Sequence, residues 1–129
     1  MGRRLPDDQT YHQTATENDI IPYQWVALEI LTEEQGKRKY THKSDVWSFG
    51  VTMWEIFTYC EEVPYEDMDD EEEVMEYLMN GNRLEKKGEM NDEIYGIMKK
   101  CWEKEPSNRP TFVELYQQIK KLCPQGLFF

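Results

Sequence analysis

Residues 44–59 read S-D-V-W-S-F-G-V-T-M-W-E-I-F-T-Y, and this stretch decides the fold class. It predicts a helix over 45–59, with Ser44 as the N-cap and Asp45 in the first turn, where a carboxylate suits the helix dipole. A helix that is apolar almost all round is expected to be buried, so we expect other helices to surround this one. Its apolar side chains are Val46, Trp47, Phe49, Val51, Met53, Trp54, Ile56 and Phe57.

A weaker helical pattern precedes this stretch at residues 25–34, where Trp25, Leu28 and Leu31 recur at helical spacing. Residues 1–22 are polar, lack periodicity and contain two prolines, so we expect an extended loop. No clear alternation of apolar and polar residues, as in a β-strand, is found along the chain.

Three further helices are predicted downstream. One spans 70–80 behind an aspartate cap, one spans 92–102 behind Asn91, and the last begins with a capping box of Thr111 and Glu114. The sequence therefore predicts a mainly α fold of about five helices. The side chains expected to face inward on these three are Val74, Met75, Leu78 and Met79; Ile94, Ile97, Met98, Cys101 and Trp102; and Phe112, Leu115, Tyr116, Ile119 and Leu122.

The chain of 129 residues is acidic, with a formal net charge of −11, which makes nucleic acid an unsuitable partner. The acid is concentrated in residues 61–73. We interpret this run as a solvated loop and the acidic first turn of a helix, and the alternative is a docking patch for a basic partner. The run lacks the loop pattern of an EF-hand, so no metal site is expected.

The three cysteines, Cys60, Cys101 and Cys123, form no C-x-x-C pair. This spacing argues against a zinc site and a disulfide framework, and it favours reduced thiols in the cytoplasm. No apolar run approaches the roughly 20 residues that span a bilayer.

Motifs across nearly the whole chain resemble one family. Residues 22–29 read P-Y-Q-W-V-A-L-E, residues 40–50 read Y-T-H-K-S-D-V-W-S-F-G, and residues 101–112 read C-W-E-K-E-P-S-N-R-P-T-F. In this order they resemble the C-terminal half of a receptor-type protein tyrosine kinase catalytic domain, from the activation segment to the last helix. The stretch around Trp25 resembles that of the tyrosine kinases, because the serine/threonine kinases favour a different, G-T-containing stretch at this place. The subfamily stays open between fibroblast-growth-factor-type and discoidin-domain receptors.

The resemblance implies a division of the chain. Residues 1–28 would form the activation segment and substrate platform, residues 29–123 the helical C-lobe subdomain, and residues 124–129 a tail. The intact family phosphorylates protein tyrosine with ATP and Mg²⁺. Its N-lobe and catalytic loop have no counterpart in these residues.

The resemblance also assigns residue roles. Glu29 and Arg109 would form a structural ion pair that anchors the activation segment. Asp45 would accept backbone N–H groups of the catalytic loop. Pro22 and Trp25 would hold the substrate, and Tyr11 would be an activation-loop phosphorylation site.

The sequence contains no G-x-G-x-x-G, no H-R-D and no D-F-G. Kinase chemistry needs these groups, so we expect no catalytic residue, no metal ligand and no cofactor in this chain alone. The expected partners are protein substrates and the rest of a kinase domain. We expect self-association of the isolated chain, because the apolar helix at 45–59 would lack a neighbour, and no insertion into a membrane.

Two alternatives stay open. The chain could be a non-catalytic helical interaction module, or decoy, that competes for the substrates or partners of a full kinase. It could also be an unrelated acidic helical adaptor, which the ordered set of motifs disfavours.

Overall fold

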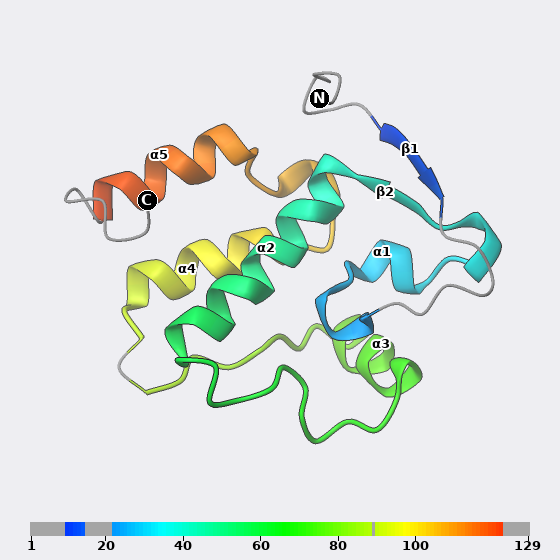
Figure 1. The fold of residues 1–129 in the computed structure, drawn as a ribbon, viewed down its shortest axis with the longest axis horizontal. Helices are drawn as coiled ribbons and strands as arrows, with labels where there is room; N and C mark the ends of the chain where they lie inside the picture. The colour runs from blue at the N-terminus through cyan, green and yellow to red at the C-terminus, as the bar shows by residue number, and fades with distance from the viewer. Residues whose placement is uncertain (1–9, 15–21, 89, 123–129) are drawn as a thin grey trace.

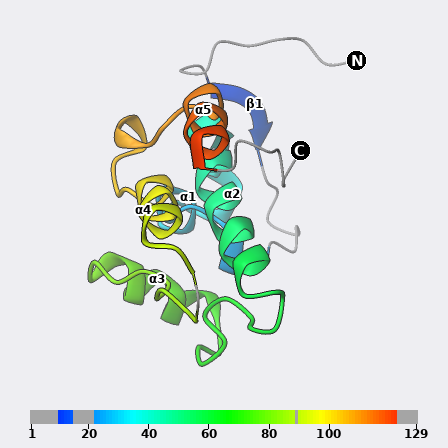
Figure 2. The ribbon, with the colours of Figure 1, turned by 90° about the vertical axis from the view of Figure 1, so that its left-hand side faces the viewer.

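The computed structural model describes residues 10–14, 22–88 and 90–122. The longest described helix, α2 (His42–Phe57), runs through the middle of the molecule with α4 (Asp92–Cys101) beside it (Figures 1 and 2). The other helices are α1 (Leu28–Leu31), α3 (Glu71–Met79) and α5 (Phe112–Leu122). The predicted mainly α fold of about five helices is confirmed.

The N-terminus of α2 lies earlier than predicted. Thr41, not Ser44, is the N-cap: the Ser44 backbone N–H donates to Thr41 Oγ1 at 3.0 Å, and the Thr41 backbone N–H donates to Ser44 Oγ at 2.8 Å. This reciprocal pair is a capping box, and it allows the helix to begin at His42. The prediction from Ser44 was wrong by about one turn because Ser44 occupies the third helical position.

The caps of α3, α4 and α5 agree with their sequence patterns. Asp70 accepts from the Glu73 N–H at 2.9 Å, and Asn91 accepts from the Glu93 N–H at 2.6 Å. The Thr111 hydroxyl accepts from the Glu114 N–H, while the Glu114 carboxylate accepts from the Thr111 N–H. Each cap satisfies N–H groups that a helix leaves unpaired at its start.

Not every apolar side chain faces inward. Met79 in the last turn of α3 is 57% exposed, and Tyr116 and Phe112 on α5 are 47% and 38% exposed. Ile56 on α2 is 47% exposed, so α2 is not covered all round. These inward predictions were wrong because α3 and α5 pack on the molecule through narrow stripes, of which Val74, Leu78, Leu115 and Ile119 are the buried members.

The core contains a close approach between α2 and the end of α4. A Cβ placed on Gly50 would lie 2.7 Å from the Cβ of Cys101 and 2.8 Å from Nε1 of Trp102. Only glycine fits at this point without a displacement of its neighbours. Trp47, Val51 and Met98 complete the fully buried centre.

A short two-stranded ribbon was missed by the sequence analysis. β1 (Thr10–Thr14) pairs antiparallel with β2 (Lys39–Thr41), with Thr10 opposite Thr41 and Thr14 opposite Lys39. Strands of three and five residues carry too few positions to produce a readable alternation. The ribbon joins residues before α1 to the segment that leads into α2 (Figure 1).

Candidate functional site

The segment that precedes α1 is fastened to α2 by two hydrogen bonds. Pro22 is followed by a 3₁₀ turn, η1 (Tyr23–Trp25), closed by the Trp25 N–H on the Pro22 carbonyl at 2.9 Å. The Trp25 indole N–H donates to Glu55 Oε1 at 2.7 Å, and the Ser48 hydroxyl donates to the Trp25 carbonyl at 2.6 Å. Pro22 is exposed and Trp25 is half-buried, so the turn offers a fixed surface.

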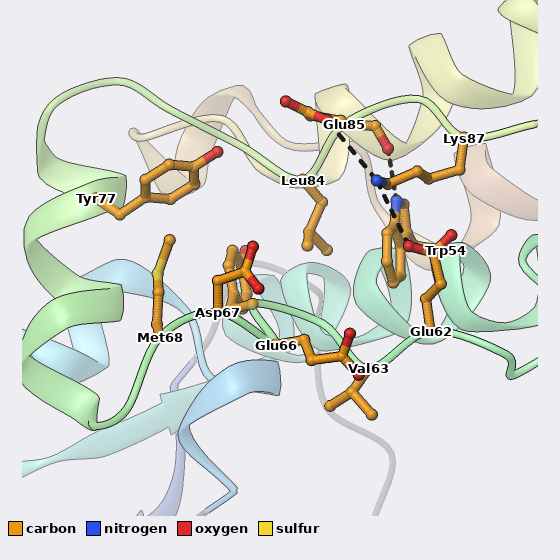
Figure 3. A pocket seen from close by; sticks show the side chains of 11 residues that line it. Trp54, Glu62, Val63, Glu66, Asp67, Met68, Tyr77, Leu84, Glu85 and Lys87 are labelled. Atoms are coloured by element: carbon orange, nitrogen blue, oxygen red, sulfur yellow. Dashed lines mark hydrogen bonds and ion pairs between the residues drawn. The ribbon is translucent and has the colours of Figure 1, made fainter.

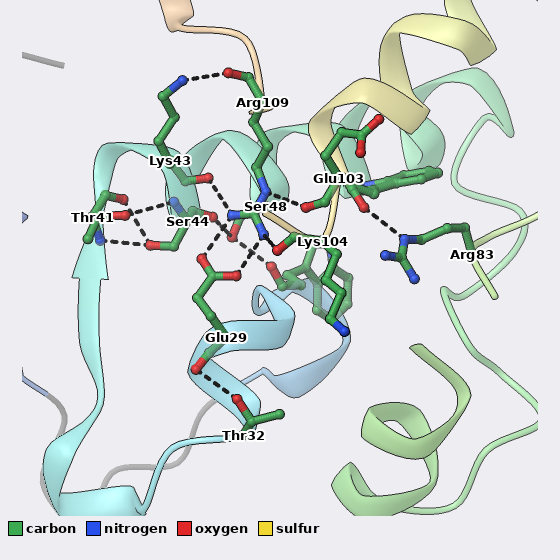
Figure 4. A network of polar contacts seen from close by, with 12 residues as sticks. Glu29, Thr32, Thr41, Lys43, Ser44, Ser48, Arg83, Glu103, Lys104 and Arg109 are labelled. Carbon is green, nitrogen blue, oxygen red and sulfur yellow. Dashed lines mark hydrogen bonds and ion pairs between the residues drawn. The ribbon is translucent and has the colours of Figure 1, made fainter. Parts of the chain in front are cut away.

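A buried arginine holds α1 against the C-terminal part of the chain (Figure 4). Arg109 Nη1 donates to Glu29 Oε2 at 2.8 Å, and Arg109 Nη2 donates to Glu29 Oε1 at 2.6 Å. The Arg109 side chain is fully buried, whereas that of Glu29 is 30% exposed. A bidentate pair of this kind fixes both groups in one plane.

The remaining donors of Arg109 are also used. Its Nε donates to the Glu103 carbonyl at 2.9 Å, and Nη1 donates to the Lys43 carbonyl at 3.0 Å. The Lys43 ammonium in turn donates to the Arg109 carbonyl. A buried guanidinium costs free energy unless its N–H groups are hydrogen-bonded. These carbonyls therefore lower the cost of burying the ion pair in the core. They belong to the segment before η3 (Pro106–Asn108) and to α2.

Two arginines stack on one tryptophan at this site. The guanidinium carbons of Arg109 and Arg83 lie 5.0 and 5.2 Å from the ring centroid of Trp47, within the range of cation–π attraction. Burial lowers the pKa of Arg83, and the charge of Arg109 lowers it further. Trp47 was predicted to lie in the core, without an electrostatic role. Arg83 belongs to no sequence motif, so its place in the site was not predicted.

The remaining predicted site residues are Asp45 and Tyr11. Asp45 is in the first turn of α2 and half-buried, close to the positive end of the helix dipole. The backbone of Tyr11 is part of β1, while its side chain lies outside the described structure. Cys123 and the tail from 124 to 129 also lie outside the described residues.

Two carboxylates of the acidic run form ion pairs among the described residues, Glu62 with Lys87 and Glu71 with Arg38. Glu71, in the first turn of α3, forms an ion pair with the buried Arg38, whose Nη2 also donates to the Leu31 carbonyl at 3.3 Å. Arg38 thereby joins the loop after α1 to α3.

The described residues were also compared with the ligand clusters that hold metal ions. Within residues 22–88 and 90–122, no three His, Cys, Asp or Glu side chains gather closely enough to hold a metal ion. The polar groups of the Glu29–Arg109 site are already paired with one another. None of the helices that the structure describes has the length and apolar character to cross a membrane.

Comparison with known proteins agrees with these features. The family model for protein tyrosine and serine/threonine kinases matches residues 1–119. The tyrosine-protein kinase transforming protein RYK of avian retrovirus RPL30 is 47% identical over 102 residues, which cover 79% of this chain and 22% of the relative. Fibroblast growth factor receptor homolog 2 of Drosophila melanogaster is 38% identical over 126 residues, covering 98% of this chain and 11% of the relative. Mouse tyrosine-protein kinase Mer is 45% identical over 102 residues, covering 79% and 10%.

The chain belongs to the protein tyrosine and serine/threonine kinase family, and its relatives place it with the tyrosine kinases. Its helical fold is that of the C-lobe of a kinase domain. It spans between 10% and 22% of the length of these three curated relatives.

Proposed function

We propose that this chain supplies the activation segment, substrate platform and helical lobe of a protein tyrosine kinase. The intact enzyme transfers the γ-phosphoryl group of ATP, with Mg²⁺, to a tyrosine hydroxyl of a protein. The division into residues 1–28, 29–123 and 124–129 is part of this proposal. By itself the chain is not catalytic, because its sequence has no counterpart of the glycine-rich loop, H-R-D or D-F-G.

The observation that supports this proposal best is the double fastening of residues 22–29. Trp25 is bonded to Glu55 and Ser48 on α2, and Glu29 is bonded to the buried Arg109. Phosphoryl transfer depends on positioning more than on covalent chemistry by the protein. A rigid platform for the substrate is therefore what a helical lobe has to provide.

The resemblance to the family suggests the individual roles that we propose. Pro22 and Trp25 hold the substrate segment, Glu29 and Arg109 keep the platform in register, and Asp45 anchors the catalytic loop from the first turn of α2. Tyr11 is phosphorylated in the intact enzyme. Tyr11 lies in β1 next to Thr10, which pairs with Thr41 at the end of β2 that leads into α2.

The proposed partners are protein substrates and the remainder of the kinase domain. The half-exposed side chains Ile56 and Phe112 suit contact with that remainder, and in the isolated chain they promote self-association. We place the activity in the cytoplasm, on the inner side of the membrane if the parent is a receptor, since ATP is available there.

Steady-state kinetics of the intact enzyme test the platform. Trp25→Ala removes the anchor to Glu55, and we expect a KM for a tyrosine peptide that is about tenfold higher. The KM for ATP should stay the same. An equal rise in both constants, or no rise in either, would remove Trp25 from the substrate site.

A second candidate function is supported by the same geometry. The bonds of Trp25 and Glu29 lie entirely within this chain, so the platform can form without the rest of a kinase. The chain would then act as a decoy that competes for substrates. Adding it in excess to a parent kinase should lower substrate phosphorylation in trans, and an unchanged rate at saturation would end this idea.

A further inference from the structure

A pocket of about 240 Å³ opens between the end of α2, the loop that follows it, α3 and the segment before α4 (Figure 3). Three aromatic side chains from separate elements line it: Trp54 from α2, Tyr65 from the loop and Tyr77 from α3. None of its lining residues belongs to the platform or the ion-pair network described above. The pocket is therefore separate from both of those sites.

Hydrogen bonds and a ring contact hold the three aromatic side chains of the pocket in place. The Trp54 indole N–H donates to the Glu85 carbonyl at 2.7 Å, and the Tyr77 hydroxyl donates to the Arg83 carbonyl at 3.3 Å. The rings of Tyr65 and Tyr77 meet edge to face with centroids 6.1 Å apart. The cavity is therefore preformed, which lowers the cost of binding.

The charge of the pocket is unbalanced. Four carboxylates line it, from Glu62, Glu66, Asp67 and Glu85, against the single amine of Lys87. Lys87 Nζ stands 3.5 Å from Glu62 and 3.8 Å from Glu85, and Figure 3 shows it between them. No ion pair with Glu66 or Asp67 is found in the part of the chain that the structure describes. Negative charge beside aromatic faces is the environment that attracts a cation.

The lining also contains a buried hydroxyl without a partner. Tyr65 is 6% exposed, and its phenol oxygen has no hydrogen-bond partner among the described residues. Burial raises the pKa of Tyr65 well above its ordinary value, so the phenol stays protonated. A buried polar group without a partner destabilises a fold, and an incoming ligand with a polar head can supply one.

We propose that this pocket binds the side chain of an arginine or lysine in a basic segment of a partner protein. The site is distinct from the substrate platform, and the proposal does not depend on the kinase activity.

The size of the pocket favours a side chain over a free small molecule. Its volume is below the roughly 300–1,000 Å³ of typical small-molecule sites. A second hollow of about 280 Å³ shares Glu62 and Lys87 with it, and carries the apolar side chains of Phe57, Tyr59 and Met90. Two adjoining hollows suit two neighbouring residues of a peptide, the first cationic and the second apolar.

Fluorescence anisotropy with a labelled peptide tests the proposal. The probe is acetyl-Gly-Ser-Arg-Leu-Gly-Ser-amide, titrated with the 129-residue chain, and the reference peptide has citrulline, a neutral isostere, in place of arginine. We expect the arginine peptide to bind at least about tenfold more tightly. Equal affinities, or equal competition by free arginine amide, would overturn the proposal of a peptide-binding site.

Two double variants, each lacking two negative charges, distinguish binding in the pocket from attraction by the net charge of the chain. Glu66→Gln with Asp67→Asn removes two charges from the pocket, whereas Asp69→Asn with Glu72→Gln removes two exposed charges outside it. The pocket variant should lose about tenfold in affinity and the control less than about twofold. Equal losses would show that only the net charge attracts the peptide, and the proposal would be wrong.

Two single variants test peptide binding in a way that loss of folding cannot imitate. Lys87→Gln removes the internal competitor of the guest cation, so affinity should rise several-fold, a gain that a misfolded chain cannot produce. Tyr65→Phe deletes only the unpartnered hydroxyl, so it should weaken binding without lowering the midpoint of urea unfolding. A Lys87→Gln chain with unchanged or weaker binding would contradict the proposal.

Discussion

Arg109 and Glu29, 80 positions apart, form two hydrogen bonds of 2.8 and 2.6 Å, with the arginine side chain fully buried. This pair connects the segment that precedes α5 to the first turn of α1. Because Arg109 also caps carbonyls of Glu103 and Lys43 and stacks on Trp47, it joins four parts of the chain at one point. Loss of the pair would affect both stability and the alignment of the platform.

Glu29→Gln is expected to lower the free energy of unfolding by about 2–3 kcal/mol, because it leaves a buried guanidinium without its counter-charge. Equilibrium urea unfolding measures this. The matched control is Glu34→Gln, whose partner Lys37 is 3.4 Å away and whose side chain is 79% exposed. The control should cost less than about 0.5 kcal/mol. Similar costs for the two variants would contradict a buried, structural pair.

Gly50→Ala should destabilise the chain by about 1–3 kcal/mol, because the added methyl group meets Cys101 and Trp102. Gly96→Ala is the control within α4, since nothing lies within 4 Å of its Cβ position. There alanine should stabilise by roughly 0.5–1 kcal/mol through helix propensity. Thermal unfolding of both variants checks the prediction, and a neutral Gly50→Ala would mean that α2 and α4 are less closely packed than described.

Stability should fall in alkali through Cys101. Burial raises the pKa of this thiol from 9.0 to about 12, so the folded chain retains a proton that the unfolded chain releases. The thiol's contribution is fully present below pH 9 and is lost as the pH rises towards 12, by roughly 1 kcal/mol per pH unit.

Urea unfolding between pH 8 and pH 10.5, compared with Cys101→Ala, isolates this contribution. The variant should show a shallower decline over that interval, and an identical decline would refute the assignment. The exposed Cys60 serves as an internal reference, because it should react with iodoacetamide in the folded chain while Cys101 does not.

The isolated chain should self-associate through the face formed by α2 and α5. Phe49 and Phe112 meet edge to face with centroids 5.9 Å apart, and Ile56 lies two turns beyond Phe49 on the same side of α2. Ile56→Lys should shift the chain towards monomer in sedimentation velocity. Met79→Lys changes an even more exposed apolar residue on α3 and should leave the association unchanged. A monomer at all concentrations before any substitution would exclude this surface.

Local signals predicted α3, α4 and α5 well, whereas of the helix predicted over 25–34 only Leu28–Leu31 is α-helical. The apolar stripes of α4 and α5 and the caps at Asp70, Asn91 and Thr111 depend on residues within one or two turns, so their patterns are visible in the sequence. The start of α2 was misplaced because Thr41 and Ser44 can each act as a cap. The reciprocal capping box, in which Ser44 is the third helical residue, makes Thr41 the cap.

The site could be predicted only in part. Glu29 and Arg109 came from the resemblance to a family, since no local pattern connects residues so far apart. The stacking of Arg83 and Arg109 on Trp47 and the pocket at Tyr65 arise where loops converge. Tyr65 adopts a positive φ of 54°, which few residues other than glycine adopt. Because the residue is a tyrosine and not a glycine, nothing in the sequence indicated this backbone conformation.

Phosphoamino-acid analysis shows whether the protein that contains this chain is a tyrosine kinase. The polypeptide encoded by the native transcript is incubated with radiolabelled ATP, Mg²⁺ and a glutamate–tyrosine polymer, with the 129-residue chain in parallel. We expect phosphotyrosine from the native product if H-R-D and D-F-G are encoded upstream, and none from the 129-residue chain alone. Tyrosine phosphorylation by the chain alone, or a native product with both motifs that labels only serine and threonine, would contradict this expectation.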